Sequence, residues 1–297
     1  MFISLGMRFV ANIEALNMAE TIGNLSKHRK APVVVMRPDG YRVFYVPAIS
    51  GESIAHAYQA SIVELAKKLY DKPPIDEWSL RGEFFKFMDN RHLTPSLQNV
   101  VGAFKSKRED LTAVKHEFEK TAISDSIIAD IGGFLYAEAP PVKRTSVFQV
   151  GYAVPVADAL EATVIESQLH VRHAPVESRA ERAEGEAAQA EERAAQMLYY
   201  VETGSAVYGL TFNIDLDMIG RTSLVKIEDA VSEEERVKRM KIAVLALSET
   251  LCEGGYGAKR SRFLPIGSIE SICVAVTKTG SFVVSPPQEK DFITVSY

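Results

Sequence analysis

Residues 3–14 read ISLGMRFVANIE, and apolar side chains alternate with polar or small ones along this stretch. Ile3, Leu5, Met7, Phe9, Ala11 and Ile13 fall on one side, and Ser4, Arg8, Asn12 and Glu14 on the other. Strict alternation over this length is typical of a β-strand with one buried face. The chain therefore opens with a strand whose apolar side covers a hydrophobic core.

Further strands and two helices follow this strand. Strands are predicted at 33–36 and 42–46, around the turn signal Pro38-Asp39-Gly40, and at 147–156, 162–171, 201–216 and 269–277. One helix is predicted from Ser50, its N-cap, to about Leu69. A second runs over 232–251, where Ser232 and Glu235 form a capping box. Residues 71–125 have too poor a period for more than partial helix, and we treat them as a helical insertion.

Without its insertions, this order of elements is strand, helix, two strands, helix, strand. It predicts an α+β fold with a modified RRM-like or ferredoxin-like βαββαβ core, elaborated within a single domain over 1–297. Both helices of such a core cover the same face of the sheet. The other face is expected to be free, and RNA-recognition domains bind RNA on that face. The fold alone does not establish a function.

Bulk composition excludes several classes of protein. The chain has 297 residues, 46% of them hydrophobic and 25% charged, and a formal charge of −5, so it is not a histone-like protein that coats DNA. No apolar run is long enough to span a membrane, and the N-terminus lacks the pattern of a signal peptide. Cys252 and Cys273 lack metal-ligand spacing and are expected to be buried or half-buried thiols. A cytoplasmic protein is expected.

Four separate segments combine small residues with cations: Gly23–Lys30, Ile49–His56, Pro140–Ser146 and Gly254–Phe263. The last is the most informative, because three glycines within four residues precede Lys259, Arg260 and Arg262. Such loops let a backbone and its cations approach a phosphate-rich polymer closely. Each segment also has a plainer explanation, as a helix stop, a solvated loop or a simple helix cap.

Evidence for catalysis or a bound metal is weak. The sequence contains no HExxH, CxxC, GxSxG or phosphate-binding GxxxxGK[ST] motif. His170 and His173 fall on opposite faces of a strand, which argues against a shared metal site. Asp125 and Asp130 are the only acidic pair that we would consider for a nuclease. No catalytic residue, metal or cofactor is therefore predicted.

Residues 177–195 differ from the rest of the chain. They hold six acidic residues and three arginines, a net charge of −3, and no apolar side chain larger than alanine. A helix of this composition has no face to bury, so we expect a mobile acidic tip on the hairpin that spans 162–215.

Several longer motifs, taken together, resemble a known family. They are GNLSKHRKAPVVV (23–35), YVPAISGESIAHAYQAS (45–61), DIGGFLYAEAPPVKRTS (130–146), QLHVRHAP (168–175) and GGYGAKRSRFLP (254–265). In this order they resemble the DevR-like CRISPR-associated proteins, the seventh Cas family, which form the backbone of archaeal type I-A Cascade. The resemblance spans nearly the whole chain and is weakest in 71–125 and 177–195.

The resemblance implies a crescent or right-hand shape and a role in antiviral defence. Family members stack head to tail in a helical filament along the CRISPR RNA (crRNA), which lies in a basic groove and pairs with complementary target DNA. A hairpin thumb presses on the RNA of the neighbouring subunit, and 162–215 is the candidate here. The implied partners are crRNA, target DNA, further copies of the chain and other Cascade subunits. The family is not catalytic in type I systems.

Carried over by position, the resemblance implies a set of RNA-contact residues. They are Asn24, Lys27, His28, Arg29, Ser50, Gly51, Ser53, Lys143, Arg144, Thr145, His170, Gly254, Gly255, Lys259, Arg260 and Arg262.

Two alternatives stay open. One is a metal-dependent ribonuclease resembling the type III relatives, with Asp125 or Asp130 as the residue to test. The other is a structural oligomer whose basic loops bind a protein.

Overall fold

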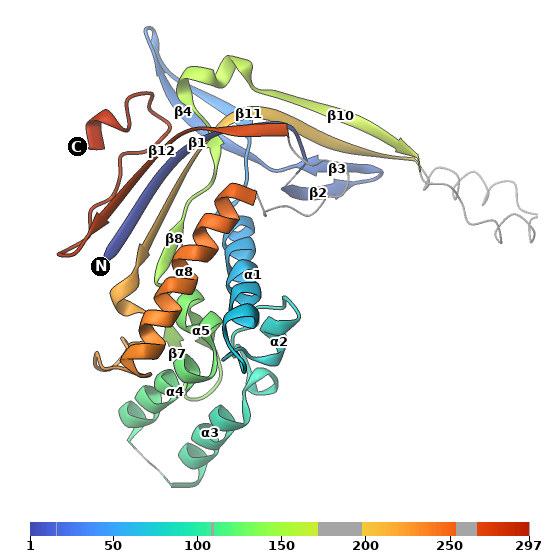
Figure 1. Cartoon of the computed structure of the whole chain (residues 1–297). Helices are drawn as coiled ribbons and strands as arrows, with labels where there is room; N and C mark the ends of the chain where they lie inside the picture. The colour runs from blue at the N-terminus through green and yellow to red at the C-terminus, as the bar shows by residue number, and fades with distance from the viewer. Residues whose placement is uncertain (16, 108–109, 172–197, 254–265, 297) are drawn as a thin grey trace, which may run out of the picture.

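The computed structural model describes residues 1–15, 17–107, 110–171, 198–253 and 266–296. Its main sheet places β1 (Phe2–Glu14) between β12 (Ile266–Thr277) and β11 (Leu198–Asp215), antiparallel to both (Figure 1). The other edge of β11 pairs antiparallel with three shorter strands, β8 (Phe148–Val150), β9 (Val154–Pro155) and β10 (Val164–Val171). The chain is thus an α+β protein built on one large sheet.

The apolar side of β1 faces the core, as its alternation predicts. Met7 is 1% exposed and lies opposite Leu210 of β11 and Ile272 of β12. Two helices, α1 (Gly51–Leu69) and α8 (Glu233–Glu253), contribute to this core, and Tyr58 Oη donates to Ala243 O at 3.0 Å between them.

Both predicted helix starts are confirmed. Ser50 Oγ accepts from Ser53 N at 3.2 Å, and Ser232 Oγ accepts from Glu235 N at 3.3 Å.

The side of β1 that carries polar or small residues is buried as well. It is covered by the C-terminal tail, residues 278–296, which follows β12 and folds back across the sheet. Val284 N donates to Ser4 Oγ at 2.9 Å, and Gln288 Nε2 donates to Gly209 O at 3.2 Å. Phe292 is 1% exposed, and a Cβ on Gly6 would lie 3.2 Å from its ring. The expectation of a free face is therefore wrong for the middle of the sheet. The tail has no periodicity that would have predicted where it packs.

Two hairpins follow β1. The first, β2 (Met18–Ile22) and β3 (Leu25–His28), replaces the loop predicted there, and β3 pairs parallel with β11. The second, β4 (Lys30–Arg37) and β5 (Gly40–Pro47), confirms the predicted turn, with Gly40 at a φ of +125°.

The strand predicted over 147–156 is divided into β8 and β9. Between them Gly151 N still donates to Thr211 O of β11 at 3.2 Å, but Ala153 exchanges backbone hydrogen bonds of 2.9 and 3.0 Å with Ile49 instead. The hairpin arm of β10 and β11 leads to residues 172–197, so the predicted acidic tip at 177–195 lies outside the described residues (Figure 1).

A part of the chain that is mostly helical lies at the lower end of α1, and we call it the helical part (Figure 1). Its elements are α2 (Glu77–Leu80), α3 (Pro95–Lys107), α4 (Leu111–Asp125), α5 (Ile127–Gly132), β6 (Phe134–Tyr136) and β7 (Val142–Arg144). A second core built on Phe87, Phe118 and Tyr136 holds it together. Short 3-10 helices complete the chain: η1 (Asn90–His92), η2 (Ala157–Ala162), η3 (Leu216–Met218) and η4 (Thr294–Ser296). No helix among the described residues is long and apolar enough to cross a membrane.

Candidate nucleic-acid interface

The first basic segment lies on the β2–β3 hairpin. Asn24 is exposed in its turn, beside Gly23 at a φ of +55°, and its carbonyl oxygen accepts from Tyr200 N at 2.7 Å. Lys27 is half-buried, with Nζ 3.4 Å from Glu20 Oε1. Both residues therefore lie at the surface, with the charge of Lys27 partly balanced.

His28 ends β3 and points into the protein. Its Nε2 lies 2.9 Å from Glu14 Oε2, and both side chains are fully buried. Burial by itself lowers the pKa of His28, but the hydrogen bond and charge of Glu14 outweigh it, so the pKa is raised. The implied RNA contact by the His28 side chain is therefore corrected, because the imidazole is held by Glu14 inside the protein.

Arg29 connects the first segment to the start of α1, and Asn17 makes the connection. The Asn17 carbonyl oxygen accepts from Arg29 N at 2.7 Å, and its side-chain oxygen accepts from Ser50 N at 2.7 Å. Arg29 Nη1 donates to Tyr152 Oη at 3.4 Å, whereas its buried Nε has no partner within the described ranges. Asn17 and Tyr152 were not predicted, because neither lies in a basic segment. A half-buried guanidinium with spare donors suits a phosphate.

Groups of the protein itself occupy the space around the start of α1, where a phosphate would bind. Ser50 is 3% exposed, and a Cβ on Gly51 would lie only 2.6 Å from the carbonyl oxygen of Val150. The Glu52 carboxylate accepts hydrogen bonds from its own backbone N–H and from the Ser50 hydroxyl, and these bonds lower its pKa. A phosphate at this helix end would compete with that carboxylate. Of the three residues implied here, only Ser53 keeps a partly exposed side chain.

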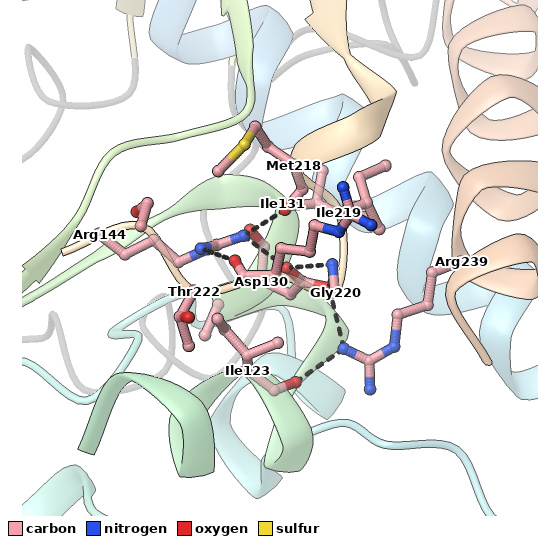
Figure 2. A network of polar contacts seen from close by, with 12 residues as sticks. Ile123, Asp130, Ile131, Arg144, Met218, Ile219, Gly220, Thr222 and Arg239 are labelled. Carbon is pink, nitrogen blue, oxygen red and sulfur yellow. Dashed lines mark hydrogen bonds and ion pairs between the residues drawn. The ribbon is translucent and has the colours of Figure 1, made fainter. Parts of the chain in front are cut away.

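The third segment lies on β7, in the helical part and away from β3 (Figure 1). Lys143 and Thr145 are exposed, but Arg144 is 4% exposed. Figure 2 shows its guanidinium pointing at Asp130, with Nη2 2.8 Å from Oδ1. The same group donates to the carbonyl oxygens of Met218 and Arg221 and to a Glu119 carboxylate oxygen. The implied RNA contact by Arg144 is therefore corrected to a structural role.

The carboxylates considered for a nuclease do not form a metal site. Asp130 is fully buried, and its oxygens accept from Arg144, from Arg239 Nη1 at 3.0 Å and from Gly220 N at 2.9 Å (Figure 2). Asp125 accepts from the Thr94 hydroxyl. Within the described part of the chain, no group of three or more His, Cys, Asp or Glu side chains could hold a metal ion. The ribonuclease alternative is not favoured.

His170 lies half-buried on β10, where its ring stacks on Tyr199 of β11 with 5.2 Å between centroids. Five implied contacts fall outside the described residues and stay predictions: Gly254, Gly255, Lys259, Arg260 and Arg262.

The structure thus brings together two of the four segments, through Asn17 and through the hydrogen bond of 2.9 Å that Ala48 N donates to Arg29 O. The third segment lies apart from them on β7 (Figure 1).

The known proteins that this chain resembles in sequence are all CRISPR-associated proteins of one kind. Residues 5–297 match the family described as "CRISPR-associated negative auto-regulator DevR/Csa2". The "CRISPR-associated aCascade subunit Cas7/Csa2 2" of Saccharolobus solfataricus is 39% identical over 300 residues, covering 98% of this chain and 84% of that protein. The "CRISPR-associated protein Cas7/Cst2/DevR" of Methanocaldococcus jannaschii is 26% identical over 297 residues, covering 100% and 87%.

A solved structure titled "CRISPR RNA-guided surveillance complex, pre-nicking" contains a chain with a similar fold. The TM-score is 0.51 at 12% identity, and the match covers 96% of this chain and 78% of that one. At this identity the likeness concerns the fold alone.

Proposed function

Because this chain belongs to the DevR/Csa2 family of CRISPR-associated proteins, we propose that it is a backbone subunit of a Cascade interference complex. In this role it binds crRNA through the RNA backbone and leaves the bases free to pair with target DNA. Copies of the chain line up along the guide in a helical filament, together with other Cascade subunits. The subunit holds the RNA and has no catalytic role of its own.

The observation that carries this proposal is the family match over 5–297, together with 39% identity to a relative named as a Cascade subunit. The strand order supports an RRM-like core. Helix α1 lies between β1 and the strands β8–β10 in the chain, and α8 lies between β11 and β12, which is the βαββαβ order.

The proposed RNA contacts in the described residues are those with accessible side chains. They are Asn24, Lys27, Arg29, Ser53, Lys143, Thr145 and His170, and the glycine loop at 254–262 is proposed beside them. Ser50 and Gly51 shape the start of α1, and Tyr152 and Asn17 position Arg29.

The test is the binding of single-stranded RNA at several salt concentrations. If about four phosphates are neutralised per subunit, the logarithm of the affinity falls against that of salt with a slope near −3. Arg29→Ala, Lys143→Ala and Arg262→Ala should each weaken binding about equally for all sequences and make the slope shallower.

The matched control is Lys68→Ala, an exposed cation in the last turn of α1. It should leave affinity and slope unchanged. A purified protein that neither carries nor binds RNA, or one whose loop variants bind like the wild type, would contradict the proposal. Cleavage of guide-paired RNA upon addition of Mg²⁺ would contradict the non-catalytic role.

A further inference from the structure

A cleft of about 520 Å³ opens at one end of the sheet face that the C-terminal tail crosses. It lies where the segment after β7 meets the end of β11 and the start of the tail. Its polar and aromatic lining includes Phe2, Thr145, Gln149, Asn213, Asp215 and Ser281. The cleft is within the usual size range of small-molecule sites, about 300–1,000 Å³.

Two amides face each other on neighbouring strands in this cleft. Gln149 of β8 lies directly opposite Asn213 of β11, so both side chains project from the same face of the sheet. Asn213 Oδ1 accepts from Ser4 Oγ at 2.6 Å, which leaves its N–H donors for another group. The Gln149 amide is exposed and has no partner in the part of the chain that the structure describes. Paired donors and acceptors of this kind match the edge of a nucleobase.

An aromatic ring and a carboxylate stand beside the amides. Phe2 lies opposite Asp215 in the register of β1 and β11. Asp215 Oδ1 accepts from Asp217 N at 3.1 Å, which leaves Oδ2 to accept from a hydroxyl. Arg144 also borders the cleft, but its guanidinium is already held by Asp130, Glu119 and backbone carbonyl oxygens. The cleft therefore offers a negative charge and no spare cation, which disfavours a phosphate and suits an uncharged ligand rich in hydroxyls.

We propose that this cleft binds the nucleoside part of one nucleotide. The base stacks on Phe2, its edge bonds to Gln149 and Asn213, and a ribose hydroxyl donates to Asp215. This inference rests on the proposed function, because that function is what identifies the partner as a nucleic acid. It adds a nucleoside site to the phosphate contacts, so that the protein holds one base while the other bases stay free to pair. This site lies at the uncovered end of a face that the tail otherwise occupies.

The test titrates the full chain with uridine, cytidine, adenosine and guanosine, using saturation-transfer NMR. At least one ribonucleoside should bind, and inorganic phosphate should not compete with it. Loss of a stacking ring typically weakens binding by at least about fivefold, so Phe2→Ala should do the same here. Gln149→Ala changes an exposed side chain and should weaken binding without changing the melting temperature. Gln98→Ala, an exposed glutamine on α3, is the matched control and should bind like the wild type.

The inference is overturned if no ribonucleoside binds, if phosphate competes, or if Phe2→Ala and Gln149→Ala both bind like the control. Single-stranded RNA binding, measured on the same proteins, separates this failure from that of the proposed function. A chain that binds RNA normally but no nucleoside refutes the cleft alone. A chain that binds nucleosides but no RNA refutes the proposed function.

Discussion

Arg144 Nη2 lies 2.8 Å from Asp130 Oδ1, and neither side chain is more than 1% exposed. Asp130 also accepts from Arg239 Nη1 at 3.0 Å, so one carboxylate joins β7, α5 and α8. This junction attaches the helical part of the chain to the helix that covers the main sheet.

Arg144→Ala should therefore destabilise the protein rather than weaken an RNA contact. Removing one partner leaves buried carboxylates without compensation, a loss of about 3–5 kcal/mol in the free energy of unfolding. Urea denaturation measures it. The adjacent Lys143→Ala, at an exposed position, should change that free energy by no more than about 0.5 kcal/mol. An Arg144→Ala protein that is as stable as the wild type but binds RNA more weakly would contradict the structural role and support the RNA contact implied by the family resemblance.

His28 and Glu14 make stability depend on pH. The folded-state pKa of His28 is raised above its ordinary value of 6.5. The stabilisation is therefore fully present below pH 6.5 and is lost as pH rises from there through the folded-state pKa. The free energy of unfolding should fall with pH across this window in the wild type, and less steeply in His28→Gln.

The measurement is urea denaturation of both proteins at several pH values between about 6 and 8.5. Subtracting the two curves removes the other titrating groups that they share. Glu14→Gln provides a second check, because it removes the main contribution that raises the pKa of His28 and should therefore make the fall in stability with pH less steep. Parallel curves for the wild type and His28→Gln would contradict the assignment.

The regular elements were predictable from sequence because their periodicity is long. The alternation of β1 extends over twelve residues, and α1 and α8 have both an apolar stripe and an N-cap. Residues 71–125 were predicted only as a helical insertion without defined bounds. Helix α2, with four residues, makes little more than one turn, which is too short for an apolar stripe to be recognised. The prediction of one continuous strand over 147–156 was wrong, since Ala153 in its middle pairs with Ile49.

The candidate site was harder to predict, because a cation in a basic segment can face solvent or a buried acid. Lys143 and Arg144 are neighbours in sequence, but only Arg144 meets Asp130 and Glu119, which arrive from other elements. His28 meets Glu14 in the same way. No local pattern records such long-range partners, so residue type identified the basic segments but not which of their side chains are accessible.

Gly51 and Gly102 should respond oppositely to alanine. A Cβ at Gly51 would lie 2.6 Å from the Val150 carbonyl oxygen, so Gly51→Ala must push α1 away from β8 and lower the melting temperature. Gly102 lies inside α3 with open space around its missing Cβ, so Gly102→Ala should raise stability by about 0.5–1 kcal/mol. Thermal denaturation of the two variants checks both signs. An unchanged melting temperature for Gly51→Ala would mean that the helix start tolerates displacement.

Two phenylalanines of the C-terminal tail test whether the tail is part of the folded core. Phe292 is 1% exposed and rests against Gly6, whereas Phe282 is 42% exposed. Phe292→Ala should lower the free energy of unfolding by about 3–5 kcal/mol, the usual loss for a buried phenylalanine. Phe282→Ala should change it by no more than about 0.5 kcal/mol. Hydrogen exchange should in addition show faster exchange over residues 283–296 in Phe292→Ala alone. If both variants unfold like the wild type, the tail contributes nothing to stability and the sheet face beneath it is open to a ligand in solution.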